Sequence, residues 1–195
     1  MGRLTAVVHL SLDGVLQAPG RPDEDRRHDF RHGGWATPYG DHVLAEAMGS
    51  RMAAGMAGGA LLLGRRTYED FAAVWPQQSD PVAGVLNAMT KYVVSQTLSE
   101  PLPWQNSVLV AGDAPALVTE LKRDRDLTVL GSGELLRSLL PHRLVDEYLL
   151  TVHPLVLGAG RRLFDGDGHL LRLDLVDSIT TSTGVLVTTY RPSPP

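Results

Sequence analysis

The 195-residue sequence contains no cysteine, and this absence excludes several kinds of chemistry. Without cysteine there is no disulfide framework, no thiol nucleophile and no metal site built on thiolates. A surplus of basic residues is also missing, because 18 Lys and Arg face 22 Asp and Glu, for a formal net charge of −4. The charge balance therefore argues against nucleic acid or an anionic membrane as the main partner.

Long hydrophobic runs are absent as well. The longest apolar-leaning stretch, residues 52–63, is too short to span a bilayer and is rich in Gly and Ala. The N-terminal segment is too short and too polar for a signal peptide, since His9 and Asp13 interrupt it. With 43% hydrophobic residues, the chain is expected to form one soluble domain, residues 1–195, in the cytoplasm.

Short apolar strands alternate with helical segments through the middle of the chain. The expected strands are residues 4–10, 60–63, 91–95, 107–111, 127–130 and 147–154. The expected helices are residues 39–56, 67–74, 114–125 and the segment that follows Gly133. Residues 170–179 and 185–191 alternate apolar and polar positions around a turn at 181–184, which is typical of a hairpin. The pattern predicts a three-layer α/β fold with a mixed, mostly parallel central sheet and a C-terminal antiparallel hairpin.

One strand end has the geometry of an anion site. The strand at 127–130 runs into Gly131-Ser132-Gly133, and an apolar-periodic segment follows. A strand, a glycine turn and a helix bring backbone N–H groups and a positive helix end to one point, where a phosphate is the usual occupant. Many strand-to-helix turns contain G-x-G for geometry alone, so this motif needs support from elsewhere.

Two further strand ends supply that support. Gly64-Arg65-Arg66-Thr67 follows the strand at 60–63, where arginine can bind phosphate bidentately and Thr67 can cap the next helix. The strand at 91–95 ends in the hydroxyl and amide donors of residues 95–97. Ligands of open α/β sheets bind beyond the carboxyl ends of the strands. Together the three strand ends predict a nucleotide site.

Four motifs resemble those of the dihydrofolate reductases, and more closely those of the C-terminal reductase domain of the bifunctional riboflavin-biosynthesis deaminase–reductase. They are S-L-D-G-V-L at 11–16, L-L-L-G-R-R-T-Y-E at 62–69, Y-V-V-S at 92–95 and V-L-G-S-G-E-L-L at 129–136. Residues 144–164 are similar to the segment that follows in the riboflavin branch. The resemblance implies a dihydrofolate reductase-like fold. It also implies an NADPH-dependent oxidoreductase that reduces a small heterocyclic substrate, similar to 5-amino-6-(5-phosphoribosylamino)uracil reductase.

The resemblance further implies which residues bind NADPH. Two arginines with nearby hydroxyls suit a 2′-phosphate, whereas NAD sites usually present an acidic residue to the ribose. Ser132 departs from the commoner all-glycine turn; it is expected to be tolerated if its backbone keeps a negative φ, and its hydroxyl could add a donor. The implied contacts are Gly64, Arg65, Arg66 and Thr67 at the 2′-phosphate and pyrophosphate, Ser95 and Gln96 at the 2′-phosphate, Gly131, Ser132, Gly133, Glu134 and Leu135 at the pyrophosphate, and Val8, His9 and Leu16 beside the nicotinamide.

The substrate half of the site is less determined by the motifs. Dihydrofolate reductases carry a carboxylate on the helix before G-R-x-T, but the family spacing lands near Met48 in this chain. We take Asp13 and Glu46 as the catalytic candidates. The structural alternatives are that Asp13 only fixes a turn and that Glu46 is a solvated helix residue. Further candidates for substrate contact are Trp35, Asp41 and the turn at 158–162.

Other interpretations stay open or are disfavoured. The charged segment 21–34 is either a mobile surface linker or a lid over the ligand. His28 and His32 have helical spacing but lie in a segment without a helical pattern, so no metal site is expected. A nucleotide- or flavin-binding module without turnover is the main functional alternative, and true dihydrofolate reductase activity is a third. The apolar run at 148–157 makes a homodimer plausible.

Overall fold

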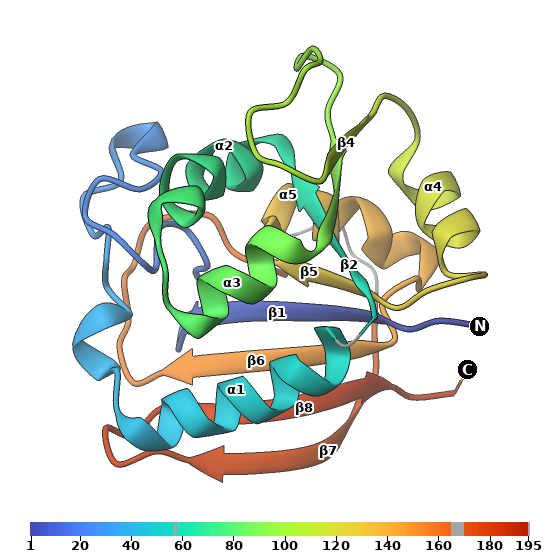
Figure 1. Ribbon diagram of the computed structural model, residues 1–195. Helices are drawn as coiled ribbons and strands as arrows, with labels where there is room; N and C mark the ends of the chain where they lie inside the picture. Colours follow the sequence, from blue (N-terminus) through green and yellow to red (C-terminus); the bar gives the residue numbers. More distant parts are fainter. Residues whose placement is uncertain (57, 165–169, 195) are drawn as a thin grey trace.

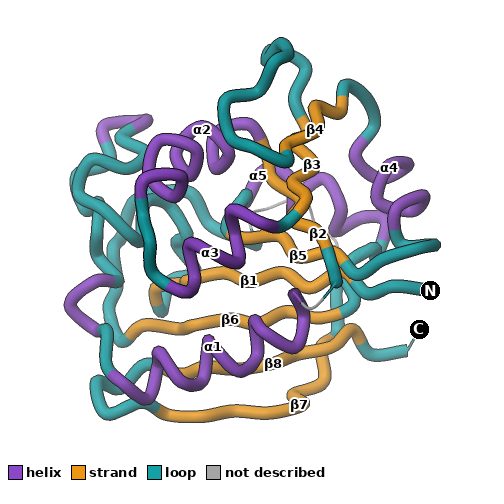
Figure 2. The backbone as a smooth tube through the Cα atoms, in the orientation of Figure 1, coloured by secondary structure: helices purple, strands orange, loops and turns teal. Residues whose placement is uncertain are grey.

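The computed structural model describes residues 1–56, 58–164 and 170–194. In this described part of the chain eight strands form one sheet, in the order β4-β3-β2-β5-β1-β6-β8-β7 (Figures 1 and 2). The strands are β1 Leu4–Ser11, β2 Ala60–Gly64, β3 Thr90–Val94, β4 Ser107–Val110, β5 Leu127–Leu130, β6 Glu147–His153, β7 Leu173–Thr180 and β8 Leu186–Pro192. The α-helices are α1 His42–Met56, α2 Arg65–Val74, α3 Pro81–Ala88, α4 Ala114–Leu121 and α5 Gly133–Leu139. Short 3-10 helices are η1 Arg27–Asp29, η2 Thr37–Tyr39, η3 Trp75–Gln77 and η4 Leu140–His142.

The sheet is parallel from β4 to β6 and antiparallel at its C-terminal edge. Each neighbouring pair from β4 through β6 is parallel. Strand β8 pairs antiparallel with β6 on one side and with β7 on the other, so the last hairpin completes the sheet. The predicted mixed, mostly parallel sheet with a C-terminal antiparallel hairpin is therefore confirmed.

Helices cover both faces of the sheet and give the three predicted layers. One core packs α1, α2 and α3 against one face, through residues such as Ala47, Tyr68 and Leu86. The other core packs α4 and α5 against the opposite face, through residues such as Val118 and Leu136. Figure 1 shows α1 and α3 crossing in front of the strands.

The central strands are buried on both faces, which explains why their sequences are continuous apolar runs. All four residues of β5 are buried, as are Ala60 to Leu63 of β2. The run from Tyr148 belongs to this group, since Tyr148, Leu149 and Leu150 lie inside β6. The first part of the run therefore packs within the chain, whereas Val156 near its end is 69% exposed, and the homodimer stays a prediction.

Helix α3 was not predicted from the sequence. Its signals are local: Asp80 precedes Pro81, and the Asp80 carboxylate accepts hydrogen bonds from the backbone N–H groups of Val82 and Ala83 at 2.9 and 3.1 Å. Helix α2 begins at Arg65 rather than at residue 67, with Gly64 as its N-cap. The predicted Thr67 cap is thus wrong, and Thr67 lies in the first turn of the helix.

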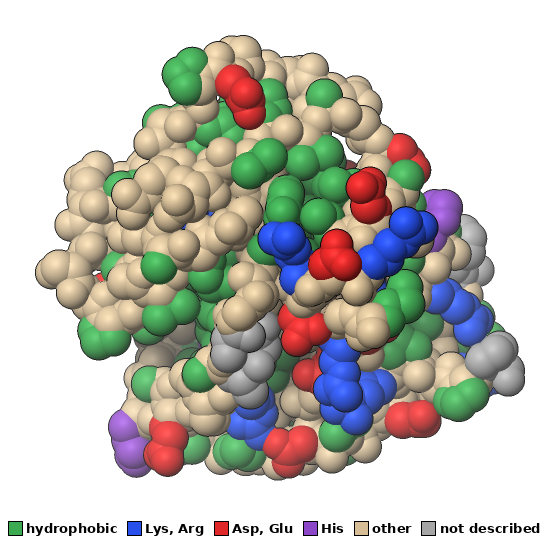
Figure 3. Space-filling view, turned by 45° about the vertical axis from the view of Figure 1, so that its right-hand side comes forward, with side chains coloured by type: hydrophobic (Ala, Val, Ile, Leu, Met, Phe, Trp, Pro, Cys, Tyr) green, Lys and Arg blue, Asp and Glu red, His purple; other side chains and the backbone are tan. Residues whose placement is uncertain are grey.

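Two surface properties bear on partners. No helix in the described ranges combines the length and apolar character needed to cross a membrane. On the face shown in Figure 3, Lys and Arg side chains lie interspersed with Asp and Glu rather than in one basic patch.

Candidate functional site

The three predicted strand ends meet at one cavity. Strands β3, β2 and β5 are parallel neighbours, so their carboxyl ends lie at the same edge of the sheet. A cavity of about 1110 Å³ opens there. All fourteen residues implied as cofactor contacts line it: Val8, His9, Leu16, Gly64, Arg65, Arg66, Thr67, Ser95, Gln96, Gly131, Ser132, Gly133, Glu134 and Leu135.

Ser132 connects two of the strand ends. Its hydroxyl accepts a hydrogen bond from the backbone N–H of Gly64 at 3.1 Å and donates to the carbonyl of Leu130 at 3.2 Å. Its own backbone N–H donates to the Thr67 hydroxyl at 3.2 Å. Ser132 has φ 43° and ψ 50°, in the left-handed region, so the condition of a negative φ is not met and the serine is accommodated in another way. The hydroxyl contacts offset the strain that this conformation costs a residue with a Cβ.

Variants of Ser132 separate strain from hydrogen bonding. We expect Ser132→Ala to lower the free energy of unfolding by about 1–2 kcal/mol, because the strain stays while the hydroxyl contacts are lost. Ser132→Gly should cost less than Ser132→Ala, because glycine adopts positive φ without strain. Urea titration of the three proteins measures both values. A glycine variant less stable than the alanine variant would contradict the left-handed conformation.

Gly133 lacks a side chain where Leu16 packs. A Cβ at Gly133 would lie 2.8 and 2.9 Å from the two methyl carbons of Leu16. The turn after β5 and the loop after β1 are therefore in close contact on the cavity wall. A flat ligand that lies along this wall would touch backbone at Gly133 and methyl groups at Leu16.

Positive charge and hydroxyl groups line the end of the cavity beside β2 and β3. Arg65 and Arg66 open α2, and the Arg65 side chain, 37% exposed, lies 3.4 Å from the Glu69 carboxylate. Ser95 is buried, and its hydroxyl accepts hydrogen bonds from the backbone N–H groups of Thr97 and Leu98 at 3.1 and 3.0 Å. These contacts fix the turn after β3 beside the arginines.

Comparison with known proteins agrees with this arrangement. Residues 3–187 match the protein family described as the RibD C-terminal domain. The chain belongs to this family. Membership supports a reductase-type function and confirms the resemblance inferred from the four motifs.

This RibD-type chain is similar to one protein compared by sequence and to two proteins of known structure, among others. The uncharacterized protein YyaP of Bacillus subtilis (strain 168) is 28% identical over 137 residues, which cover 67% of this chain and 72% of that protein. A Shewanella sp. PV-4 structure named for riboflavin biosynthesis has a TM-score of 0.69 at 19% identity, covering 98% of this chain and 99% of that one. Dihydrofolate reductase from Enterococcus faecalis, in complex with NADP(H), has a TM-score of 0.58 at 14% identity, covering 99% and 98%. The structural matches show that the RibD-type chain has the dihydrofolate reductase-like fold.

Asp13 is not among the described residues that line the cavity of this RibD-type chain. Its carboxylate accepts hydrogen bonds from the Ser11 hydroxyl at 2.6 Å and from the backbone N–H groups of Leu157 and Gly158 at 3.1 and 3.0 Å. Arg162 donates to the Asp13 carbonyl at 2.8 Å and pairs with its carboxylate. The Ser11 hydrogen bond, ahead of the two backbone donors, holds the pKa of Asp13 well below its usual range. The geometry favours the turn-fixing alternative: Asp13 ties the loop that carries Leu16 to the 155–162 turn.

Glu46 and Asp41 also lie away from the cavity lining. Glu46 is exposed on α1, while Met48 and Met52 of the same helix line the cavity. The position where the family spacing expects a carboxylate is thus methionine. Asp41 accepts a hydrogen bond from the Leu44 backbone N–H at 2.7 Å at the start of α1 and another from the Ser182 hydroxyl at 2.5 Å, so it anchors the β7–β8 turn.

Part of the charged segment 21–34 lines the cavity. Arg21, Glu24, Asp25 and Arg27 contribute to the lining, after residues 18–20 of the preceding loop, and the Arg21 guanidinium forms a two-point ion pair with Asp70 on α2. Gln17 donates to the carbonyls of Asp25 and Arg27 at 2.9 and 3.1 Å. These contacts favour the lid alternative over the linker.

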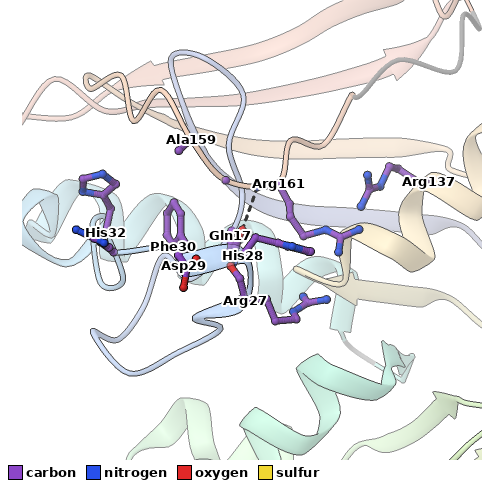
Figure 4. Close-up of a pocket in the computed structure, with 11 residues that line it drawn as sticks. Gln17, Arg27, His28, Asp29, Phe30, His32, Arg137, Ala159 and Arg161 are labelled. Atoms are coloured by element: carbon purple, nitrogen blue, oxygen red, sulfur yellow. Dashed lines mark hydrogen bonds between the residues drawn. The ribbon is translucent and has the colours of Figure 1, made fainter.

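A smaller cavity of about 450 Å³ opens beside the large one. It lies between loop residues 27–32 and the 159–161 turn, where the backbone N–H of Arg161 donates to the Gln17 side chain at 3.1 Å (Figure 4). Within the described residues no group of three or more His, Asp or Glu side chains is arranged to bind a metal ion. The two cavities share four lining residues, Gln17, Arg27, Arg137 and Arg161.

Sequence reasoning missed His153. It lies at the end of β6 with no solvent exposure, and its Nε2 is 3.0 Å from Nδ1 of His9, a lining residue of the large cavity. The two histidines are 144 positions apart, so no local pattern could pair them. Trp35, a predicted substrate contact, is buried against His153 with ring centroids 5.2 Å apart.

Proposed function

We propose that the protein is an NADPH-dependent oxidoreductase that reduces a C=N or C=O bond of a small heterocycle. The observation that carries the proposal is that all fourteen residues implied by the resemblance line one cavity. Its volume of about 1110 Å³ has room for a dinucleotide and a small second ligand. When bound, NADPH would supply the hydride.

In this proposal the chain positions the cofactor through three kinds of contact. Arg65 and Arg66 bind the 2′-phosphate by charge-assisted hydrogen bonds, with donors from the Ser95 turn. The turn at 131–133 and the residues that follow it lie under the pyrophosphate. Val8 and Leu16 pack against the nicotinamide, and the contact of Leu16 with Gly133 supports the fit of a flat ring there.

The substrate compartment is proposed to lie on the α1 side of the sheet. Met48 and Met52 of α1 and Phe71 and Trp75 beyond it line the same cavity. These side chains suit a planar, largely apolar ring. Because α1 presents methionine where dihydrofolate reductases carry a carboxylate, we do not favour dihydrofolate as the substrate.

Calorimetric titration with NADPH and NADH tests the cofactor assignment. We expect micromolar binding of NADPH and at least tenfold weaker binding of NADH, a gap of about 1.4 kcal/mol, because NADH lacks the 2′-phosphate. Equal affinities would remove the proposed role of the two arginines. If the protein binds neither NADPH nor NADH, the assignment of a nicotinamide cofactor is wrong.

A binding module without turnover is the second candidate, and it is favoured by Met48 and Met52, the residues that α1 contributes to the cavity lining. None of the described α1 residues that line the cavity carries a titratable group, so α1 supplies no proton donor. Absorbance of the purified protein reveals a co-purified flavin. Oxidation of NADPH by a pterin or pyrimidine acceptor would exclude this candidate.

A further inference from the structure

His9 is a titratable lining residue whose strand, β1, faces α1. His9 is two residues after Val7 in β1, and residues two apart in a strand point to the same face of the sheet. Val7 packs in the core that includes α1, so the His9 side chain also points to the α1 face. Val7, His9, Met48 and Met52 all line the large cavity. His9 therefore lies where the proposed heterocycle would sit.

His153 fixes one side of the His9 ring. The Nε2 atom of His153 is 3.0 Å from Nδ1 of His9, and His153 is fully buried. Trp35 and Tyr39 meet the His153 ring edge-on, with ring centroids at 5.2 and 5.6 Å. The Trp35 indole N–H donates to the Gln17 carbonyl at 2.7 Å, and this hydrogen bond fixes the Trp35 ring against His153.

The hydrogen bond between the rings has one favoured direction. The Nδ1 atom of His153 is buried and has no hydrogen-bond partner among the described residues. A buried N–H without a partner is rarer than a buried acceptor without one. The proton of His153 is therefore placed on Nε2, from which it donates to Nδ1 of His9. His9 then carries its proton on Nε2, the nitrogen left to meet a ligand.

Both rings are neutral near pH 7. Burial lowers the pKa of His9 to about 4, and burial together with the neighbouring His9 lowers the pKa of His153 to about 4. A neutral imidazole is a hydrogen-bond donor and can stabilise negative charge that develops on a carbonyl.

We infer that His9 is a substrate-binding residue, whose Nε2–H donates a hydrogen bond to a carbonyl oxygen or ring-nitrogen acceptor of the heterocycle. His153 is a positioning residue that fixes the His9 tautomer. The acceptor atom gains negative charge as the ring is reduced, so this hydrogen bond strengthens toward the transition state. The inference rests on the proposed function for the identity of the ligand. The tautomer itself does not depend on that function.

Long-range 1H–15N spectra of 15N-histidine-labelled protein test the tautomer. We expect the Nε2–H form for His9 in the native protein and a mixture of the two tautomers in His153→Phe, which keeps a ring without a donor. His142→Gln, a substitution at an exposed histidine, is the matched control and should leave the His9 signals unchanged. The Nδ1–H form of His9 in the native protein would overturn the inference.

The substrate-binding role is tested with 5-aminouracil as the probe, titrated in the presence of NADP+. We expect the His9 Nε2 signal to shift in the native protein. The affinity for the probe should fall at least tenfold in His9→Phe and less in His9→Gln, which keeps an N–H donor. An unshifted signal, or equal affinities in the native protein and His9→Phe, overturns the role. Failure of the proposed function is seen separately, as absence of NADPH binding to the native protein.

Discussion

Replacing Arg65 and Arg66 together by alanine is expected to weaken NADPH binding at least 100-fold while changing the affinity for NADH less than threefold. Each charge-assisted hydrogen bond to a phosphate contributes about 1.5–3 kcal/mol, so two lost contacts exceed the roughly 2.7 kcal/mol that a 100-fold change represents. NADH offers no phosphate at this position, so its affinity should depend little on these arginines. Calorimetric titration of both cofactors gives the two ratios.

The double substitution should leave the fold intact. Arg65 is 37% exposed, and its ion pair with Glu69 has the i,i+4 spacing that contributes only about 0.3–0.5 kcal/mol. The melting temperature should therefore change by no more than a few degrees.

A matched control separates local contacts from overall charge. Arg123→Ala combined with Arg172→Ala removes the same charge from two exposed arginines that are not among the described lining residues. This control should bind NADPH like the native protein. If both double variants lose NADPH affinity equally, the net charge of the protein, and not local contacts of Arg65 and Arg66, attracts the cofactor. No loss in either would falsify the assignment of the 2′-phosphate to this pair.

The sequence predicted the part of the site that depends on parallel strands. Apolar runs that end in Gly64, Ser95 and Gly131 are local signals, and the rule that parallel carboxyl ends share one edge brings them together. The same reasoning could not place Asp13 or Glu46. The first is fixed by a turn more than 140 positions away, and the second depends on which side of α1 meets the sheet.

Conformations maintained by distant contacts were also beyond the sequence. A negative φ is the default for serine, but Ser132 adopts a positive one because Gly64 and Thr67 hold it from another strand end. The pairing of His9 with His153 arises from the β1–β6 register, which places Thr151 beside His9 and His153 beside Ser11. Register between parallel strands far apart in sequence is not encoded in either strand alone.

The structural role of Lys91 could not be predicted from the apolar pattern of the strand that contains it. In the sequence it reads as the first residue of an apolar strand, yet its side chain is fully buried. Its ammonium donates to the carbonyls of Leu86, Asn87 and Met89 at 2.8, 3.2 and 2.7 Å, at the end of the unpredicted helix α3. The ammonium also lies 4.4 Å from the centre of the Trp104 ring. Burial lowers the pKa of Lys91 to about 8, so the group is mostly charged at pH 7.

Lys91→Met is therefore expected to lower the free energy of unfolding by about 3 kcal/mol, because the buried carbonyls of Leu86 and Met89 lose the ammonium donor. For a chain of this length the loss corresponds to a fall of roughly 6–12 °C in melting temperature. Arg172→Met, at an exposed position, should change it by less than about 0.5 kcal/mol. Thermal and urea unfolding of the three proteins measure these differences, and a Lys91→Met protein as stable as the native one would show that the ammonium contributes no net stability.

The same variant separates stability from binding. Lys91 lies at the start of β3 and is not among the described lining residues, whereas Ser95 follows the other end of that strand. Below the melting transition we expect Lys91→Met to bind NADPH within threefold of the native protein, because the folded molecules keep the same strand ends. A loss of affinity in fully folded Lys91→Met would instead mean that the α3–Trp104 packing sets the position of the Ser95 turn. The arginine pair and the buried lysine thus give opposite expected patterns, one acting on affinity without stability and the other on stability without affinity.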